Sequence, residues 1–109
     1  MLPGVYIVSF SAGSRTGQGL AVLNGQKING GDASYLYRGQ YTETNGKAQA
    51  TLEIKSHTAG ANSVFGNYPV LHLTLTGASN PMGFTMTGAT KEVANMTITI
   101  TGKKIGDLA

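Results

Sequence analysis

The sequence predicts an all-β protein: a single domain over residues 1–109, with about eight antiparallel strands closed into an up-and-down barrel. Four successive segments alternate apolar and polar residues with a period of two, which is typical of a half-buried sheet. Two Asn-Gly pairs, at 24–25 and 45–46, are strong hairpin signals because a type I′ turn needs two residues with positive φ. Closing such a sheet removes its exposed edges; a two-sheet sandwich is the alternative.

The first predicted strand, residues 4–12, is apolar on both faces. Tyr6 and Phe10 carry the larger side chains, so we expect their face to point into the barrel. Val5 and Ile7 then lie outside, although a strand with two apolar faces is unusual in a small antiparallel protein. A weakly charged, self-complementary apolar surface favours association, so we predict a two-fold homodimer with Val5 and Ile7 in or beside its interface.

Turn signals divide the rest of the chain. The Gly30-Gly31-Asp32 corner ends a short strand, and the Asp32 carboxylate is expected to accept hydrogen bonds from nearby backbone N–H groups. Gly39 indicates a bulge or sharp bend within its strand. The further strands are predicted at 17–23, 26–29, 35–44, 47–57, 69–76, 82–87 and 96–101.

The alternating pattern assigns apolar side chains of the later strands to the barrel interior and threonines to the outside. Val64 and Phe65 are an apolar pair in the polar connection 58–67, and we predict that they cover one barrel mouth. The residues predicted to form the core, or to line a ligand cavity within it, are Tyr6, Phe10, Leu52, Leu73, Phe84, Met86 and Ile98.

The tyrosines Tyr35, Tyr37 and Tyr41 share one face of their strand. They could line a ligand pocket. We favour the alternative that their rings pack in the core while their hydroxyl groups reach the rim of the barrel.

Few residues could perform catalysis. His57 and His72 lie in different segments. His72 falls on the threonine face of its strand, so it is expected to be a surface residue, and it has no obvious carboxylate partner at strand spacing. Nothing in the spacing indicates the third ligand that a metal site with both histidines would need. The serines lie in no nucleophile elbow, and no helix follows the paired glycines to make a phosphate site. The sequence therefore predicts no catalytic residue, no metal, no cofactor and no enzyme activity.

Composition narrows the class of protein. The net charge is +3, but the basic residues are scattered, which argues against nucleic-acid binding. No cysteine is present, no secretory signal is recognised at the N-terminus, and no apolar run approaches the roughly 20 residues of a membrane helix. An outer-membrane barrel would need more aromatic residues than the eight here. A cytoplasmic protein is expected.

The first 45 residues contain four glycine-rich motifs: GxYxxxF (Gly4, Tyr6, Phe10), GxG (Gly17, Gly19), NGxxxxGGD (Asn24, Gly25, Gly30, Gly31, Asp32) and YxG (Tyr37, Gly39). Together they resemble the GrlR family, small negative regulators associated with type III secretion. The resemblance implies an eight-stranded, lipocalin-like barrel that forms a homodimer and binds a protein. The family's type member uses a Glu-Asp-Glu-Asp run after its fourth strand; the equivalent residues 42–46 contain only Glu43, so that site is not carried over.

Two functional hypotheses follow. The first is a non-enzymatic regulator or adaptor that acts through contacts with a regulatory protein. The alternative is a small carrier or sensor that binds an apolar ligand inside the barrel.

Overall fold

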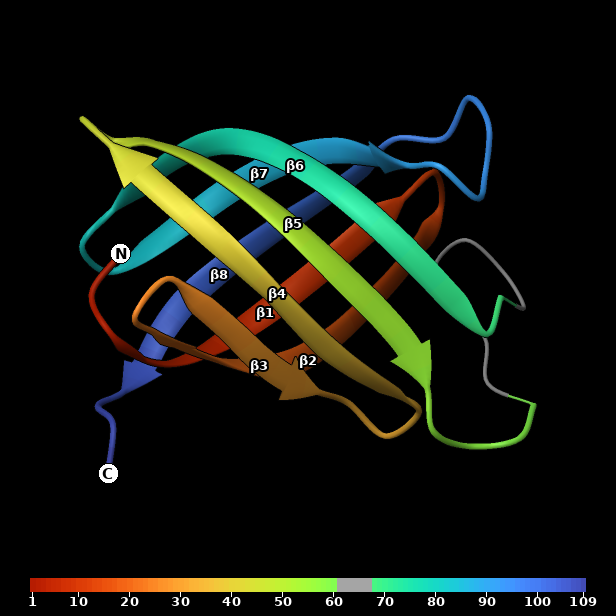
Figure 1. Cartoon of the computed structure of the whole chain (residues 1–109), viewed down its shortest axis with the longest axis horizontal. Helices are drawn as coiled ribbons and strands as arrows, with labels where there is room; N and C mark the ends of the chain where they lie inside the picture. The colour runs from red at the N-terminus through yellow and green to blue at the C-terminus, as the bar shows by residue number, and fades with distance from the viewer. Residues whose placement is uncertain (61–67) are drawn as a thin grey trace.

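The chain forms a closed barrel of eight antiparallel strands (Figure 1). The computed structural model describes residues 1–60 and 68–109, and this part of the chain contains no helix that could cross a membrane. Each strand pairs with the next, and β1 pairs with β8 to close the barrel, which confirms the predicted fold class against the sandwich. The strands are β1 (Gly4–Ala12), β2 (Arg15–Asn24), β3 (Lys27–Gly31), β4 (Tyr35–Thr44), β5 (Lys47–Ser56), β6 (Val70–Asn80), β7 (Gly83–Thr90) and β8 (Ile98–Gly106).

Strand boundaries near the C-terminus differ from the prediction. Strand β6 continues to Asn80, and Met82 lies in the following turn with 54% of its surface exposed. The Asn80 side chain accepts a hydrogen bond from the Met82 N–H group at 2.9 Å, and Pro81 has no N–H to donate to a ladder. Met96 likewise precedes β8. The prediction that Met82 and Met96 belong to strands was therefore wrong.

The β2–β3 turn is shifted by one residue from its predicted position. The residues with positive φ are Gly25 (58°) and Gln26 (66°), not Asn24 and Gly25. The observed register pairs Leu23 with Ile28, whereas a turn centred on the Asn-Gly pair would set Gln26 opposite Leu23. The observed register buries Ile28 beside Leu23, whereas the predicted one would place Gln26 there. Burial of the apolar side chain explains why the turn lies one residue later.

The other Asn-Gly turn is confirmed. Asn45 has φ of 52° and Gly46 has φ of 76°, and Thr44 pairs directly with Lys47 across this two-residue loop. Two residues in the left-handed region are what a type I′ hairpin requires.

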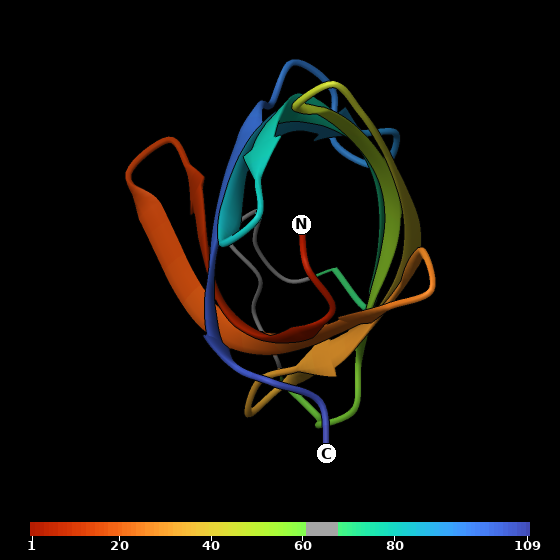
Figure 2. The ribbon, with the colours of Figure 1, turned by 90° about the vertical axis from the view of Figure 1, so that its left-hand side faces the viewer.

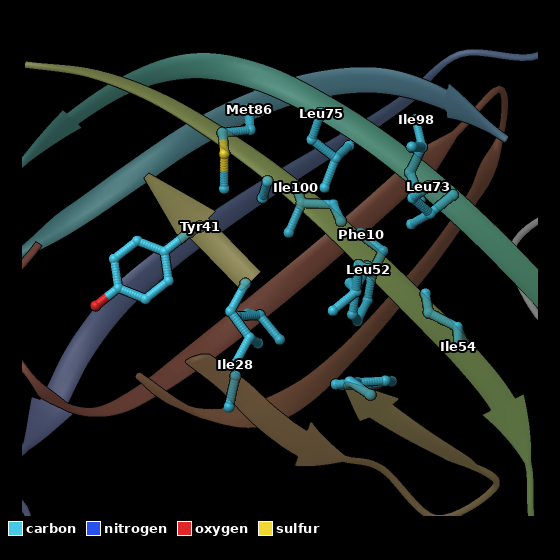
Figure 3. Packing of buried hydrophobic residues seen from close by; sticks show 14 of the residues in the cluster. Phe10, Ile28, Tyr41, Leu52, Ile54, Leu73, Leu75, Met86, Ile98 and Ile100 are labelled. Carbon is cyan, nitrogen blue, oxygen red and sulfur yellow. The ribbon is translucent and has the colours of Figure 1, made fainter. Parts of the chain in front are cut away.

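The core lies inside the barrel and draws side chains from all eight strands (Figure 3). Strand β1 buries Tyr6 and Phe10, while Val5 and Ile7 are only partly buried on the outer side. The Tyr6 ring lies 6.0 Å from the Phe84 ring, and the Phe10 ring meets Tyr37 edge-on at 5.2 Å. The aromatic rings therefore pack in the interior, and the Phe10–Tyr37 pair has the edge-to-face geometry that aromatic pairs prefer.

Two glycines in the wall make room for these rings. A Cβ atom on Gly102 would lie 2.1 Å from the ring of Phe84, its partner on β7, and one on Gly19 would lie 2.4 Å from the Tyr37 hydroxyl oxygen. Glycine thus leaves room for a large ring from another strand to lie over this part of the wall and fill the interior.

Candidate functional site

Among the residues that the structure describes, apolar side chains fill most of the barrel interior. All seven residues predicted for the core or a cavity are at most 9% exposed, and four of them, Phe10, Leu52, Phe84 and Met86, line an apolar internal cavity of about 30 Å³. This volume suits one or two water molecules, whereas ligand sites usually measure hundreds of Å³. The predicted lid residues Val64 and Phe65 lie outside the described residues.

The N-terminus of the chain lies at one mouth of the barrel (Figure 2). The Met1 side chain lines the internal cavity, and its ammonium group forms an ion pair with the Glu43 carboxylate, which also accepts a hydrogen bond from the Ser79 hydroxyl. The hydrogen bond from the terminal ammonium, followed by the one from Ser79, lowers the pKa of Glu43. The one acidic side chain in residues 42–46 is therefore already paired with groups of the same chain.

The Gly30-Gly31-Asp32 corner connects β3 to β4, and hydrogen bonds to the Asp32 carboxylate fix its conformation. One oxygen of the Asp32 carboxylate accepts the N–H groups of Ser34 and Tyr35, both at 2.8 Å, and the other accepts the Tyr37 hydroxyl. Burial and this hydrogen bond raise the pKa of Tyr37 well above its usual range. His57 donates from Nε2 to the Asp32 carbonyl oxygen at 3.1 Å. The Asp32 carboxylate accepts hydrogen bonds from local backbone N–H groups, as predicted. These bonds hold the start of β4 against the corner, so the role of Asp32 is structural.

His72 on the outer face has two carboxylate neighbours, so the prediction that it lacks one was wrong. Its Nδ1–H donates to Glu92 at 2.7 Å, and its Nε2 lies 3.6 Å from the Glu53 carboxylate. Glu53 is the cross-strand partner of His72, while Glu92 reaches it from the loop after β7. Strand spacing alone cannot reveal a loop residue as a partner. Within the described residues, no cluster of His, Asp and Glu side chains has an arrangement that could hold a metal ion.

Glu92 attaches the β7–β8 loop to β6 through hydrogen bonds with His72, and the strength of this attachment should depend on pH. Hydrogen bonds from Thr90 and then from His72 lower the pKa of Glu92 from 4.5 to about 2. Because the folded-state pKa is depressed, the stabilisation is complete above about pH 4.5 and is lost as the pH falls towards 2. We expect the His72 amide, which donates to Glu92, to lose protection against hydrogen exchange over that range, with the exchange rate taken relative to the intrinsic rate at each pH. In Glu92→Gln this step should be absent; an identical step in both proteins would contradict the assignment.

The outer wall of β1, β2 and β4 carries an exposed apolar surface. We call Val5, Ile7, Leu20, Val22 and Leu36 the apolar stripe. Val5 pairs with Val22 and Ile7 with Leu20, so their side chains lie side by side on the outer face. Leu36 continues the row across Gly31, which pairs with both Leu20 and Leu36 and has no side chain.

The stripe is exposed to a degree that is unusual for large apolar side chains. Leu20 is 49% exposed, Leu36 42% and Val22 37%. Contiguous apolar surface of this kind marks interaction sites on soluble proteins. Of these five residues, only Val5 and Ile7 were predicted to lie on an outer apolar surface. The uninterrupted apolar run 20–23, which leaves two of its side chains outside, is the signal that could have revealed Leu20 and Val22.

Comparison with known proteins gives one family. The family model described as "T3SS negative regulator, GrlR" matches residues 1–108, far beyond the first 45 residues that carry the glycine motifs. No curated protein matches the sequence.

Proposed function

Because this chain belongs to the GrlR family, whose model covers residues 1–108, we propose that it is a negative regulator of type III secretion that acts by binding protein. Regulation of this kind needs a contact surface and no chemical step. The apolar stripe is the observation that carries the proposal, because it exposes several large apolar side chains on adjacent strands. The alternative, a carrier of an apolar ligand, receives less support, since the internal cavity measures about 30 Å³.

The acidic loop of the family's type member has no equivalent here that could bind the same partner. Glu43 is the only acidic residue in the 42–46 turn, and its carboxylate contacts the Met1 ammonium and Ser79. A contact through the stripe on the wall of the barrel would replace that loop.

The homodimer predicted from Val5 and Ile7 would use the same stripe. Self-association therefore remains a prediction about this surface, and it competes with binding of a different protein. Light scattering of the wild type and of Val5→Asp separates the two: a wild-type dimer that Val5→Asp dissociates would assign the stripe to a second copy.

Leu20→Asp should release repression in a strain that carries a type III secretion locus and a secretion-gene reporter. The introduced charge would have to be buried in the contact, and burying an unpaired charge lowers the affinity strongly. Reporter output is expected to approach that of a strain lacking the protein, while circular dichroism and the thermal midpoint of Leu20→Asp stay close to the wild-type values.

Thr85→Asp is the matched control, because Thr85 is also exposed on the outer wall but lies on β7. It should repress like the wild type. Full repression by Leu20→Asp, at equal protein level, would mean that the stripe is not the regulatory surface.

A further inference from the structure

Strand β2 is longer than the strand that pairs with it on its β3 side. On that side the pairs end at Leu20 and Gly31, where the chain turns into the corner towards β4, while β1 accompanies β2 as far as Arg15. Within the described residues, no strand and no backbone hydrogen bond covers residues 15–19 on the β3 side, and we call this part of β2 the free edge. Figure 2 shows the β1–β2 hairpin, which carries the free edge, projecting to one side of the barrel.

The free edge presents the backbone groups of Thr16 and Gln18. Asn24 and Lys27 flank a two-residue hairpin loop, so they exchange both backbone hydrogen bonds. Alternate residues of a strand direct their N–H and C=O groups to the same side, and Thr16 and Gln18 therefore direct theirs to the β3 side, as Asn24 does. Both N–H groups and both C=O groups are available to an added strand.

The free edge lacks most of the features that protect an edge strand from pairing. Proline, a bulge or inward charges are the usual protection. The free edge contains no proline, its register against β1 is continuous, and its one charged residue, Arg15, lies at its end beside the hairpin turn. Strand β6 provides a contrast: beyond the last pair with β7, the Glu92 carboxylate accepts the His72 N–H group at 2.8 Å. That edge is covered by a side chain, whereas the free edge can accept a strand.

We propose that the free edge binds an extended segment of the protein that this chain regulates, and that the segment joins the sheet as a strand antiparallel to β2. This inference rests on the proposed function and names its mode of recognition. Backbone hydrogen bonds with Thr16 and Gln18 would hold the segment, as in other cases of β-strand addition. The segment would continue the path of β3 beyond Gly31. Leu20 belongs to the apolar stripe and to the last pair with β3, so the bound strand would be continuous with the stripe.

The charge at the end of the free edge specifies the segment further. Arg15 is exposed and, in the part of the chain that the structure describes, forms no ion pair. Residues 1–31 contain no acidic residue. A carboxylate opposite Arg15 on the added strand would form the missing cross-strand pair. We therefore expect an uncharged, β-forming segment of about five residues, without proline, that ends in Asp or Glu.

A second copy of the chain fits the free edge less well. The antiparallel register that pairs Thr16 with Gln18 of the second copy sets Gly17 opposite its own equivalent. The same register sets Arg15 opposite Gly19, so neither arginine gains a carboxylate, and the glycines contribute no side-chain contacts between the strands. The predicted homodimer would instead occupy the apolar stripe, and the free edge would then stay available to the regulated protein.

Hydrogen exchange of the protein alone tests whether the edge is open. The amides of Thr16 and Gln18 should exchange within about tenfold of their intrinsic rates. The Val22 amide also faces β3, where Val22 pairs with Asn29, and its exchange should be slowed by more than about a hundredfold. Protection of Thr16 and Gln18 as strong as that of Val22 would show that the edge is already covered, and would overturn the inference.

Thr16→Pro tests strand addition itself. The substitution removes a free N–H group and no backbone bond of the sheet, so circular dichroism and the thermal midpoint should stay close to the wild-type values. In the secretion reporter strain, output should rise to that of a strain lacking the protein, because the proline cannot donate to an added strand. Thr16→Ala is the matched control: it keeps the N–H group and should repress like the wild type.

Two further variants extend this test. Gln18→Pro removes the other free N–H group, and it should also release repression, so it serves if Thr16→Pro does not fold. Arg15→Glu should weaken repression severalfold by repelling the acidic end of the segment. Lys47→Glu is the control for this charge change, because Lys47 is exposed on β5 away from the free edge.

Three results in these experiments would overturn the inference. Full repression by a folded Thr16→Pro or Gln18→Pro protein, at equal protein level, would show that no strand is added. Equal loss of repression in Thr16→Ala would assign the effect to the side chain. A wild-type dimer that Thr16→Pro dissociates, measured by light scattering, would assign the edge to a second copy. Failure of the proposed function is distinct, since the wild type itself would then leave reporter output unchanged.

Discussion

Replacing Leu73 with alanine is expected to lower the free energy of unfolding by about 2–5 kcal/mol. Leu73 is 2% exposed on the inner face of β6, where it pairs with Leu52 on β5 and Thr90 on β7. Truncation removes buried apolar surface and leaves a cavity that the closed wall cannot readily fill by collapse. Since small domains are stable by only about 5–15 kcal/mol, the urea midpoint should fall markedly.

Thr74→Ala is the control for this substitution. Thr74 is the next residue of the same strand, but its side chain is exposed on the outer wall, so its loss should cost within about 0.5 kcal/mol. Equal destabilisation by Leu73→Ala and Thr74→Ala would contradict the assignment of Leu73 to the inner face of β6 and of Thr74 to its outer face.

Asp32→Ala is expected to lower the free energy of unfolding by about 2–4 kcal/mol. The substitution removes the acceptor for two backbone N–H groups of the corner, a loss comparable to that of a helix cap, at about 0.5–2 kcal/mol. It also leaves the Tyr37 hydroxyl, on a residue only 2% exposed, without its carboxylate partner, which costs about 1–3 kcal/mol.

A double-mutant cycle with Tyr37→Phe isolates the second contribution. Removing the hydroxyl first should make the loss of Asp32 less costly, with a coupling energy on the order of 1 kcal/mol. Strict additivity of Asp32→Ala and Tyr37→Phe in chemical denaturation would show that the hydrogen bond contributes nothing to the stability of the corner.

Several predictions from the sequence followed from local chemistry. The prediction of a turn at Asn45-Gly46 was correct. A two-residue hairpin loop of this type needs positive φ at both residues, and Asn-Gly adopts this conformation most readily. The Asn24-Gly25 turn was wrong by one residue because the alternative turn, Gly25-Gln26, places Ile28 rather than Gln26 opposite Leu23. Competition between turn propensity and side-chain burial is decided only when both strands are paired.

The candidate surface was only partly predictable. Val5 and Ile7 could be assigned to the outside because both faces of the first strand are apolar and only one face can point inward. Leu20, Val22 and Leu36 were not recognised, because their exposure depends on which strands lie beside β1 and in which register. The partnership of His72 and Glu92 was missed for the same reason: a loop residue joins a strand residue 20 positions away.

The sequence by itself determined the all-β class and the inner and outer faces of the strands. Successive side chains of a strand point to opposite faces, so the alternation of apolar and polar residues can be read directly along the chain. Only the tertiary structure decided which outer residues become neighbours. The apolar stripe combines side chains of β1, β2 and β4. Lateral order across a barrel depends on closure and on the register of each pair, and a surface built along that direction has no continuous signature in the chain.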